Sequence, residues 1–228
     1  SAIGAPVPIT PRVAVLLFGV GLVSVFITPI IYLAYAVPSV EHYRLLTWLM
    51  RFGGGLAILP ITLALVVGLA RARIVDDAAR PLRAALVSSL VLFAAGGFIG
   101  FMIHGSNTKI PAHYHGSIVG ITLAFMGVAY YLLPRFGYRA PLGRLATWQP
   151  YLYGIGQMMH MLGLLWSGGY GVQRKVAGAE QVLRTTGEVI GMGLMGLGGL
   201  VAILGGLLFV VVALRAMTGA RRGTAGRQ

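Results

Sequence analysis

The chain has 228 residues, of which 57% are apolar and 10% charged, and its mean hydropathy is +0.83. These values lie outside the range of soluble globular domains and predict an integral membrane protein. The net charge of +13 would suggest nucleic-acid binding in a soluble protein. In a membrane protein basic residues flank the spans, so we expect a lipid membrane and no nucleic acid as partner. Cysteine is absent, which excludes disulfides, cysteine-ligated metals and covalent heme attachment through Cys-x-x-Cys-His.

Six apolar runs are long enough to cross a membrane, since a hydrocarbon core of about 30 Å needs about 20 residues of α-helix. The expected spans cover residues 13–36, 45–70, 82–103, 112–133, 148–166 and 189–214. The sequence therefore predicts an all-α protein with a single transmembrane domain, a six-helix bundle, over residues 1–228. The first run is longer than the apolar part of a signal peptide and lacks its basic start, so we expect no removable targeting segment.

The basic residues fall unevenly on the two sides of these expected spans. Twelve arginines lie on the side that both termini would share: Arg12, Arg71, Arg73, Arg80, Arg83, Arg135, Arg139, Arg144, Arg215, Arg221, Arg222 and Arg227. The opposite side holds six basic residues: Arg44, Arg51, Lys109, Arg174, Lys175 and Arg184. Because cytoplasmic loops carry the excess of Lys and Arg, we expect both termini in the cytoplasm and a multi-pass protein of the bacterial inner (cytoplasmic) membrane.

Two histidines one residue apart, His113 and His115, open the fourth expected span in the stretch PAHYHG. His160 lies at a similar depth in the fifth span. Ionisable side chains within a span usually mark a site, although a membrane histidine can simply hydrogen-bond across helices. Residues two apart on a helix point about 200° from one another. His113 and His115 are therefore expected to face opposite sides of their helix and to serve separate centres.

Heme ligation is the chemistry that this histidine cluster favours. An apolar bundle without thiolates or clustered carboxylates suits a porphyrin better than a hard cation. Heme propionates need cationic partners, and Arg174 and Lys175 follow the fifth expected span. An ordinary solvated or headgroup-facing pair explains these two residues equally well. No chain of acids crosses the expected spans, which disfavours a proton pump or proton-coupled transporter.

Two stretches resemble the large catalytic subunit of heme-copper oxidases and the related nitric oxide reductases. LFAAGGFIGFMIHGSNTKIPAHYHGSIVGITLAFMG looks like that family's ninth and tenth helices, and MMHMLGLLWSGGYGVQRK is similar to its eleventh helix and the following basic loop. The resemblance covers residues 82–214 and implies that His113 binds a high-spin heme and His115 a low-spin heme. It also places Arg174 and Lys175 on the paired arginines that hold propionates.

The chain also departs from that family. It has a counterpart of only the last six of twelve helices, and the adjacent histidine pair expected for a catalytic copper is absent. We therefore expect no copper and no oxygen reduction by this chain alone. His104 falls near a histidine of an outer metal or propionate site, but one residue further from the pair. His160 matches a histidine that is not a heme ligand in the family, although its depth also suits a second axial ligand within this chain.

The leading expectation is a membrane cytochrome subunit that holds one or two non-covalent hemes, most simply b-type, near the periplasmic face. It would pass electrons between a periplasmic carrier such as a c-type cytochrome and other membrane subunits of a redox complex. One alternative is half of a split terminal oxidase or nitric oxide reductase whose partner supplies the other helices. Another is a non-catalytic heme-handling, assembly or structural subunit.

Overall fold

The computed structural model of the chain describes residues 3–6, 8–72, 76–176 and 178–219. Four of the arginines counted above lie outside these ranges: Arg73, Arg221, Arg222 and Arg227. Within the described ranges every regular element is helical and no strand occurs, which confirms the all-α prediction. The chain divides into two compact units, Ile3–Arg73 (unit 1) and Ile74–Gln228 (unit 2). The prediction of one six-helix bundle is therefore not confirmed.

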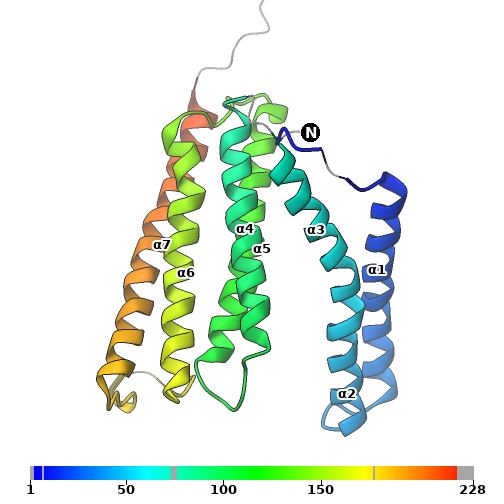
Figure 1. The fold of residues 1–228 in the computed structure, drawn as a ribbon, viewed down its shortest axis with the longest axis vertical. Helices are drawn as coiled ribbons and strands as arrows, with labels where there is room; N and C mark the ends of the chain where they lie inside the picture. The colour runs from blue at the N-terminus through cyan, green and yellow to red at the C-terminus, as the bar shows by residue number, and fades with distance from the viewer. Residues whose placement is uncertain (1–2, 7, 73–75, 177, 220–228) are drawn as a thin grey trace, which may run out of the picture. The chain divides into compact units, whose positions relative to one another are not determined.

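Unit 1 contains helices α1 (Pro11–Ala34), α2 (Val40–Trp48) and α3 (Gly55–Arg71), with a π-helix, η1 (Leu49–Gly54), joining the last two (Figure 1). Helix α2 begins five residues before the expected second span, because the hydroxyl of Ser39 caps it by accepting from the amide of His42 at 3.2 Å. The ring of His42 is buried and its Nδ1 donates to the carbonyl of Tyr35 at 3.3 Å. His42 therefore has a structural role.

Unit 2 is a bundle of helices α4 (Ala79–Gly100), α5 (Lys109–Leu132), α6 (Arg144–Gly169) and α7 (Thr186–Thr218), each antiparallel to the one before it (Figure 1). Short 3-10 helices, η2 (Leu133–Phe136) and η3 (Gly178–Glu180), lie in two of the connections. The boundaries of these four helices fall within four residues of the expected spans. Consecutive helices of the bundle pack against each other, with α6 and α7 in the longest contact.

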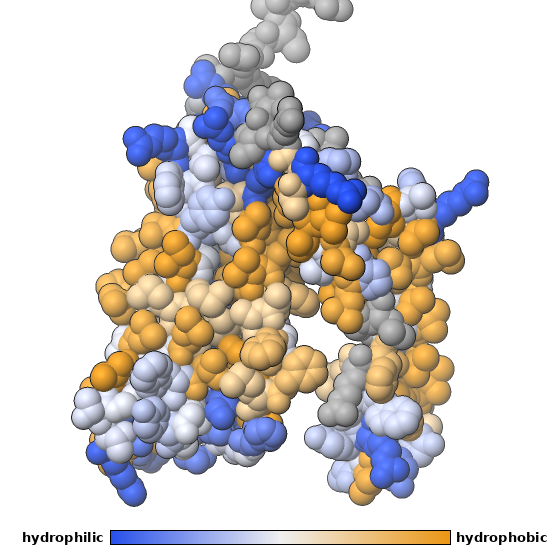
Figure 2. All heavy atoms as spheres, viewed as in Figure 1, coloured by the Kyte–Doolittle hydropathy of each residue, from blue (hydrophilic) through white to orange (hydrophobic). Residues whose placement is uncertain are grey.

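Four helices among the described residues are long and apolar enough to cross a membrane: Pro11–Ala34, Ala79–Gly100, Lys109–Phe136 and Thr186–Thr218. Large apolar side chains are exposed along them, for example Leu16 at 69% and Leu207 at 59%. Figure 2 shows hydrophobic residues around the middle of each unit and hydrophilic ones toward its ends. Exposed apolar belts of this kind need lipid around them, so the chain has the character of a multi-pass membrane protein.

Two of the six expected spans are not among these four helices. Helix α6 has 26 residues, which is long enough, but it carries Gln149, Gln157 and His160 in its interior. In the second expected span the apolar helix that qualifies by composition is the shorter segment Ile58–Arg71. Six crossings therefore stay a prediction.

Glycines bring the helices of unit 2 into backbone contact. A Cβ on Gly96 of α4 would lie 2.7 Å from the carbonyl carbon of Gly116 on α5, so this crossing requires glycine. Gly191, Gly198 and Gly205, seven residues apart on α7, likewise meet α6. Residues 191–196 also match the GxGxxG pattern, but of these three glycines only Gly191 meets α6, since nothing lies within 4 Å of a Cβ on Gly193 or Gly196.

The basic residues of unit 2 separate to its two ends, as predicted. The arginine end carries Arg80, Arg83, Arg135, Arg139, Arg144 and Arg215. The histidine end carries Lys109, Arg174, Lys175 and Arg184, together with His104, His113 and His115. Which of the two ends faces the cytoplasm stays a prediction.

Candidate functional site

His113 lies in the first turns of α5 and its ring packs on α4. Its Nδ1 lies 2.7 Å from the carbonyl oxygen of Gly96. A Cβ on Gly100, one turn further along α4, would lie 3.0 Å from both Nδ1 and Cε1 of the ring. Gly96 and Gly100 thus form a flat surface on α4, here called the glycine seat, and the partly buried imidazole of His113 packs against it.

His115 faces a different neighbour, helix α6. Its ring lies against that of His160, with 4.7 Å between the centroids and 59° between the ring planes. Tyr114, between the two histidines, is 43% exposed. The contacts of His113 with α4 and of His115 with α6 confirm that the two rings address different sides of α5.

His160 is fixed from the opposite side by helix α7. Its Nδ1 lies 2.9 Å from the carbonyl oxygen of Met195. A Cβ on Gly198 would lie 2.8 Å from the carbonyl carbon of Met159, so the backbone of α7 passes close to this part of α6. Helix α6 therefore presents His160 between α5 and α7.

The two carbonyl contacts determine the tautomers of His113 and His160. A carbonyl oxygen only accepts hydrogen bonds, so Nδ1 must carry the proton in both rings. In a neutral imidazole Nε2 then holds the free lone pair, which is the arrangement found in metal-ligating histidines. The two backbone contacts thus leave Nε2 as the nitrogen that carries the lone pair in both rings.

The basic loop after α6 is tied to the loop that precedes α5. Asn107 and Gln173 form an isolated β-bridge, and the amide of Thr108 donates to the carbonyl of Val172 at 3.0 Å. Nε of Arg174 donates to Oγ of Ser106 at 3.2 Å, while Lys175 is exposed and has a left-handed backbone, with φ of 62°. The structure therefore brings Arg174 to the end of the bundle where the His113–His115 pair lies.

His104 does not join this cluster. It is exposed, and its carbonyl accepts from Nδ2 of Asn107 at 2.9 Å. In the part of the chain that the structure describes, no three His, Asp or Glu side chains gather as a metal site. The assignment of His104 to a metal or propionate site stays a prediction.

The sequence reasoning missed the groups that orient the histidines. These are the carbonyls of Gly96 and Met195 and the open backbone at Gly100. The Gly-x-x-x-Gly spacing from 96 to 100 is a signal for close helix packing that could have identified α4 as the neighbour of His113. Backbone carbonyls carry no such signal in the sequence.

The chain has residues that fit one axial position of a heme at His113, because the seat on α4 fixes the ring and leaves Nε2 free. The His115–His160 pair fits an iron between its rings less well. Metal–imidazole bonds are about 2 Å, so two opposed imidazoles on one metal have ring centres about 6 Å apart. The observed 4.7 Å is a direct ring contact, and His160 as second axial ligand stays a prediction.

Two proteins resemble parts of this chain. A protein of Rickettsia prowazekii (strain Madrid E), described as uncharacterized, is 41% identical over 143 residues, which are 58% of this chain and 28% of that protein. An uncharacterized protein of Aquifex aeolicus (strain VF5) is 35% identical over 69 residues, 30% of this chain and 18% of that protein. No protein-family profile and no solved structure matches the chain. The chain thus spans less than a third of the length of either relative. Because both relatives are described as uncharacterized, their similarity indicates no activity for this chain.

Proposed function

We propose that the chain is a heme-binding cytochrome subunit of a membrane redox complex, related to the C-terminal half of heme-copper oxidase subunit I. The observation that carries this proposal is the pair His113 and His115, which address two different neighbouring helices from the same turns of α5. A bound heme supplies one-electron redox chemistry at its iron. We expect b-type heme because the sequence has no cysteine for covalent attachment.

His113 would act as an axial ligand through Nε2. The carbonyl of Gly96 accepts a hydrogen bond from its Nδ1 and keeps the imidazole oriented. His115 would serve a second heme on the other side of α5. Since His160 already lies in contact with the His115 ring, any further residue that holds this heme would come from outside residues 1–228.

Arg174 would hold a propionate at the histidine end. The hydrogen bond from Nε to Ser106 orients its guanidinium. The two terminal nitrogens would then bind the oxygens of a carboxylate. Lys175 is exposed beside it and would contribute a second positive charge. With this end toward the periplasm of a bacterial inner membrane, a soluble c-type cytochrome would be the natural electron carrier.

The test is the heme content of the full chain, purified with its native partners in a mild detergent. A Soret band, a pyridine hemochrome of the b type and about one or two hemes per chain are expected. His113→Ala should remove the high-spin component and His115→Ala the low-spin component, whereas His104→Ala, at an exposed loop histidine of the same end, should keep both. Absence of heme from the wild-type complex would reject the proposal and favour a structural or assembly role.

Half of a split terminal oxidase or nitric oxide reductase is a second candidate. It is favoured by the separate placement of His113, whose contact with α4 is made through Nδ1 and would leave Nε2 to hold an iron apart from the His115–His160 pair. Its reaction needs a second metal close to that iron, and its ligands would have to come from another chain. Metal analysis of the intact complex decides between the two, since about one copper or non-heme iron per chain supports the enzyme.

A further inference from the structure

A groove of about 150 Å³ opens at the arginine end of unit 2, far along the bundle from the histidines. It lies between the connection that precedes α6, the first turn of α6 and the last turns of α7. Arg139 and Arg215 stand in its lining beside Leu142, Leu145 and Val212. Two cationic side chains thus share one groove with an apolar wall.

The connection is fixed on the end of α7, which holds the two arginines in the same groove. The amide of Arg139 donates to the carbonyl of Ala216 at 3.1 Å. The side chain of Arg139 runs over Gly219, where a Cβ would lie 2.6 Å from its Cδ. Arg215 belongs to the last turn of α7. Because residue 219 is a glycine, the side chain of Arg139 can cross the end of α7.

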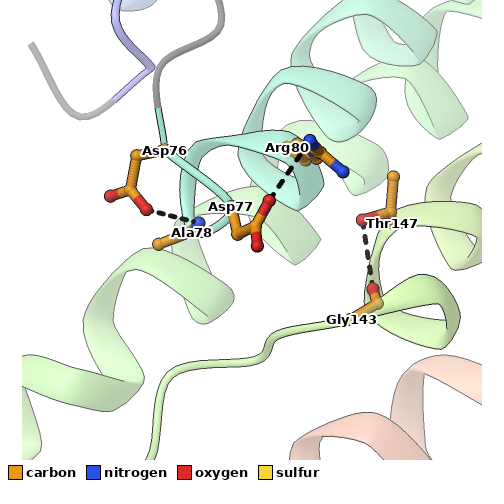
Figure 3. A network of polar contacts seen from close by, with 6 residues as sticks. All are labelled: Asp76, Asp77, Ala78, Arg80, Gly143 and Thr147. Carbon is orange, nitrogen blue, oxygen red and sulfur yellow. Dashed lines mark hydrogen bonds and ion pairs between the residues drawn. The ribbon is translucent and has the colours of Figure 1, made fainter.

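The charge at this end of unit 2 is strongly positive. Six arginines stand here against two acids, Asp76 and Asp77. Both acids are engaged beside the start of α4: Asp76 accepts from the amide of Ala78 at 3.0 Å, and Asp77 pairs with Arg80 at 3.3 Å (Figure 3). Among the described residues Arg215 has no ion pair. The groove therefore suits an anion.

The surroundings of the groove are those of a membrane interface. Leu142 is 57% exposed and Leu145 49% exposed. Trp148, one turn further along α6, is also exposed and packs edge-on with Tyr151, their ring centroids 5.9 Å apart. Tryptophan and tyrosine favour the level of the lipid headgroups. An anion that also carries hydrocarbon would cover these leucines, whereas a free phosphate would leave them exposed.

We propose that this groove binds one anionic phospholipid, with its phosphate between Arg139 and Arg215 and an acyl chain along Leu142 and Leu145. Arginine forks match phosphate oxygens in bidentate geometry. Basic pockets between transmembrane helices are known sites for anionic headgroups. The site is separate from the histidines, so it stands whether or not the chain binds heme.

The test uses the full chain in a non-ionic detergent and native mass spectrometry with two lipids of the same acyl chains. Phosphatidylglycerol should give one saturable adduct and bind at least tenfold more tightly than phosphatidylcholine. Arg139→Gln combined with Arg215→Gln should reduce the preference to less than twofold. Arg12→Gln combined with Arg44→Gln removes the same charge from unit 1 and should leave the preference unchanged.

Competition on the wild-type protein tests the acyl-chain part and needs no variant to fold. Glycerol 3-phosphate and inorganic phosphate at millimolar concentration should not displace the phosphatidylglycerol adduct. Displacement by either would show a site for free phosphate and overturn the proposal. It is equally overturned by equal binding of the two lipids, or by a preference that survives loss of both arginines.

Discussion

The carbonyl oxygen of Gly96 on α4 lies 2.7 Å from Nδ1 of His113 on α5. This hydrogen bond determines which ring nitrogen is protonated and therefore which one is left for a metal. It depends on the close crossing of the two helices, where a Cβ on Gly96 would lie 2.9 Å from the Cα of Gly116. The close glycine packing of α4 against α5 therefore also determines which ring nitrogen of His113 is protonated.

Gly100→Ala is expected to displace the His113 ring, because the new methyl group would lie 3.0 Å from Nδ1 and Cε1. Overpacking of this kind costs about 1 kcal/mol or more. If His113 binds heme, the high-spin absorption should shift or lose intensity while the low-spin signal stays. Gly97→Ala is the matched control, since nothing lies within 4 Å of its Cβ. Identical spectra for the two variants would mean that Gly100 does not lie against the His113 ring.

Gly198→Ala is expected to destabilise unit 2 by about 1–3 kcal/mol through overpacking of α6 against α7. Its Cβ would lie 2.7 Å from the carbonyl oxygen of Gly156, a backbone atom that cannot turn away. Gly196→Ala, on the same helix with nothing within 4 Å, should be neutral. The measurement is unfolding in mixed micelles. Equal midpoints for the two variants would mean that α6 and α7 do not approach this closely.

Gln149 connects α5, α6 and α7 through a buried hydrogen-bond network. Tyr130 OH donates to its Oε1 at 3.0 Å, and its Nε2 donates to the carbonyl of Gly205 at 3.1 Å. Gln149→Leu leaves the buried hydroxyl of Tyr130 without its acceptor and removes the hydrogen bond to Gly205, which costs about 1–3 kcal/mol. Gln157→Leu should cost less, because Oε1 of Gln157 already lacks a hydrogen-bond partner among the described residues. Unfolding midpoints of both variants in one detergent check the order.

Hydropathy was sufficient to locate the helices of unit 2, but not their first turns. The expected third, fourth and fifth spans start three or four residues late, because α4, α5 and α6 begin at Ala79, Lys109 and Arg144. Each of these first turns contains a basic residue, which an apolar run excludes but a helix tolerates at a membrane interface. In unit 1 the second expected span covers only the later part of α2, because the polar residues Glu41, His42 and Arg44 precede the apolar run.

The opposite directions of His113 and His115 followed from helix geometry alone. The partners of the two rings did not, because they depend on which helix packs against each side of α5. A glycine seat on α4 and His160 on α6 are products of that packing. The sequence placed Arg174 at the histidine end, but not its hydrogen bond to Ser106, since the Asn107–Gln173 bridge joins two loops that are far apart along the chain.

Thr108→Val is expected to loosen the basic loop. Oγ1 of Thr108 is buried and donates to the carbonyl of Leu164 at 2.8 Å, so valine removes a buried hydrogen bond between the loop and α6, at a cost of about 0.5–1.5 kcal/mol. Thr122→Val is the control, because its hydroxyl bonds within its own helix, to Ile118 at 3.1 Å. Hydrogen exchange should rise in residues 170–176 for the first variant and stay unchanged for the second. Equal exchange protection of residues 170–176 in both variants would contradict the contact between the two loops.

His160→Ala separates a ring contact from a metal ligand. The His115 and His160 centroids lie 4.7 Å apart, closer than the roughly 6 Å of two axial imidazoles on one metal. The variant should therefore keep any low-spin heme signal that depends on His115. It should still unfold more easily, by about 0.5–1.5 kcal/mol, because the hydrogen bond from Nδ1 to the Met195 carbonyl between α6 and α7 is lost. Electron paramagnetic resonance and unfolding measure the two effects independently. Loss of the low-spin signal in a folded His160→Ala protein would mean that the helices separate on heme binding and that His160 is the second ligand.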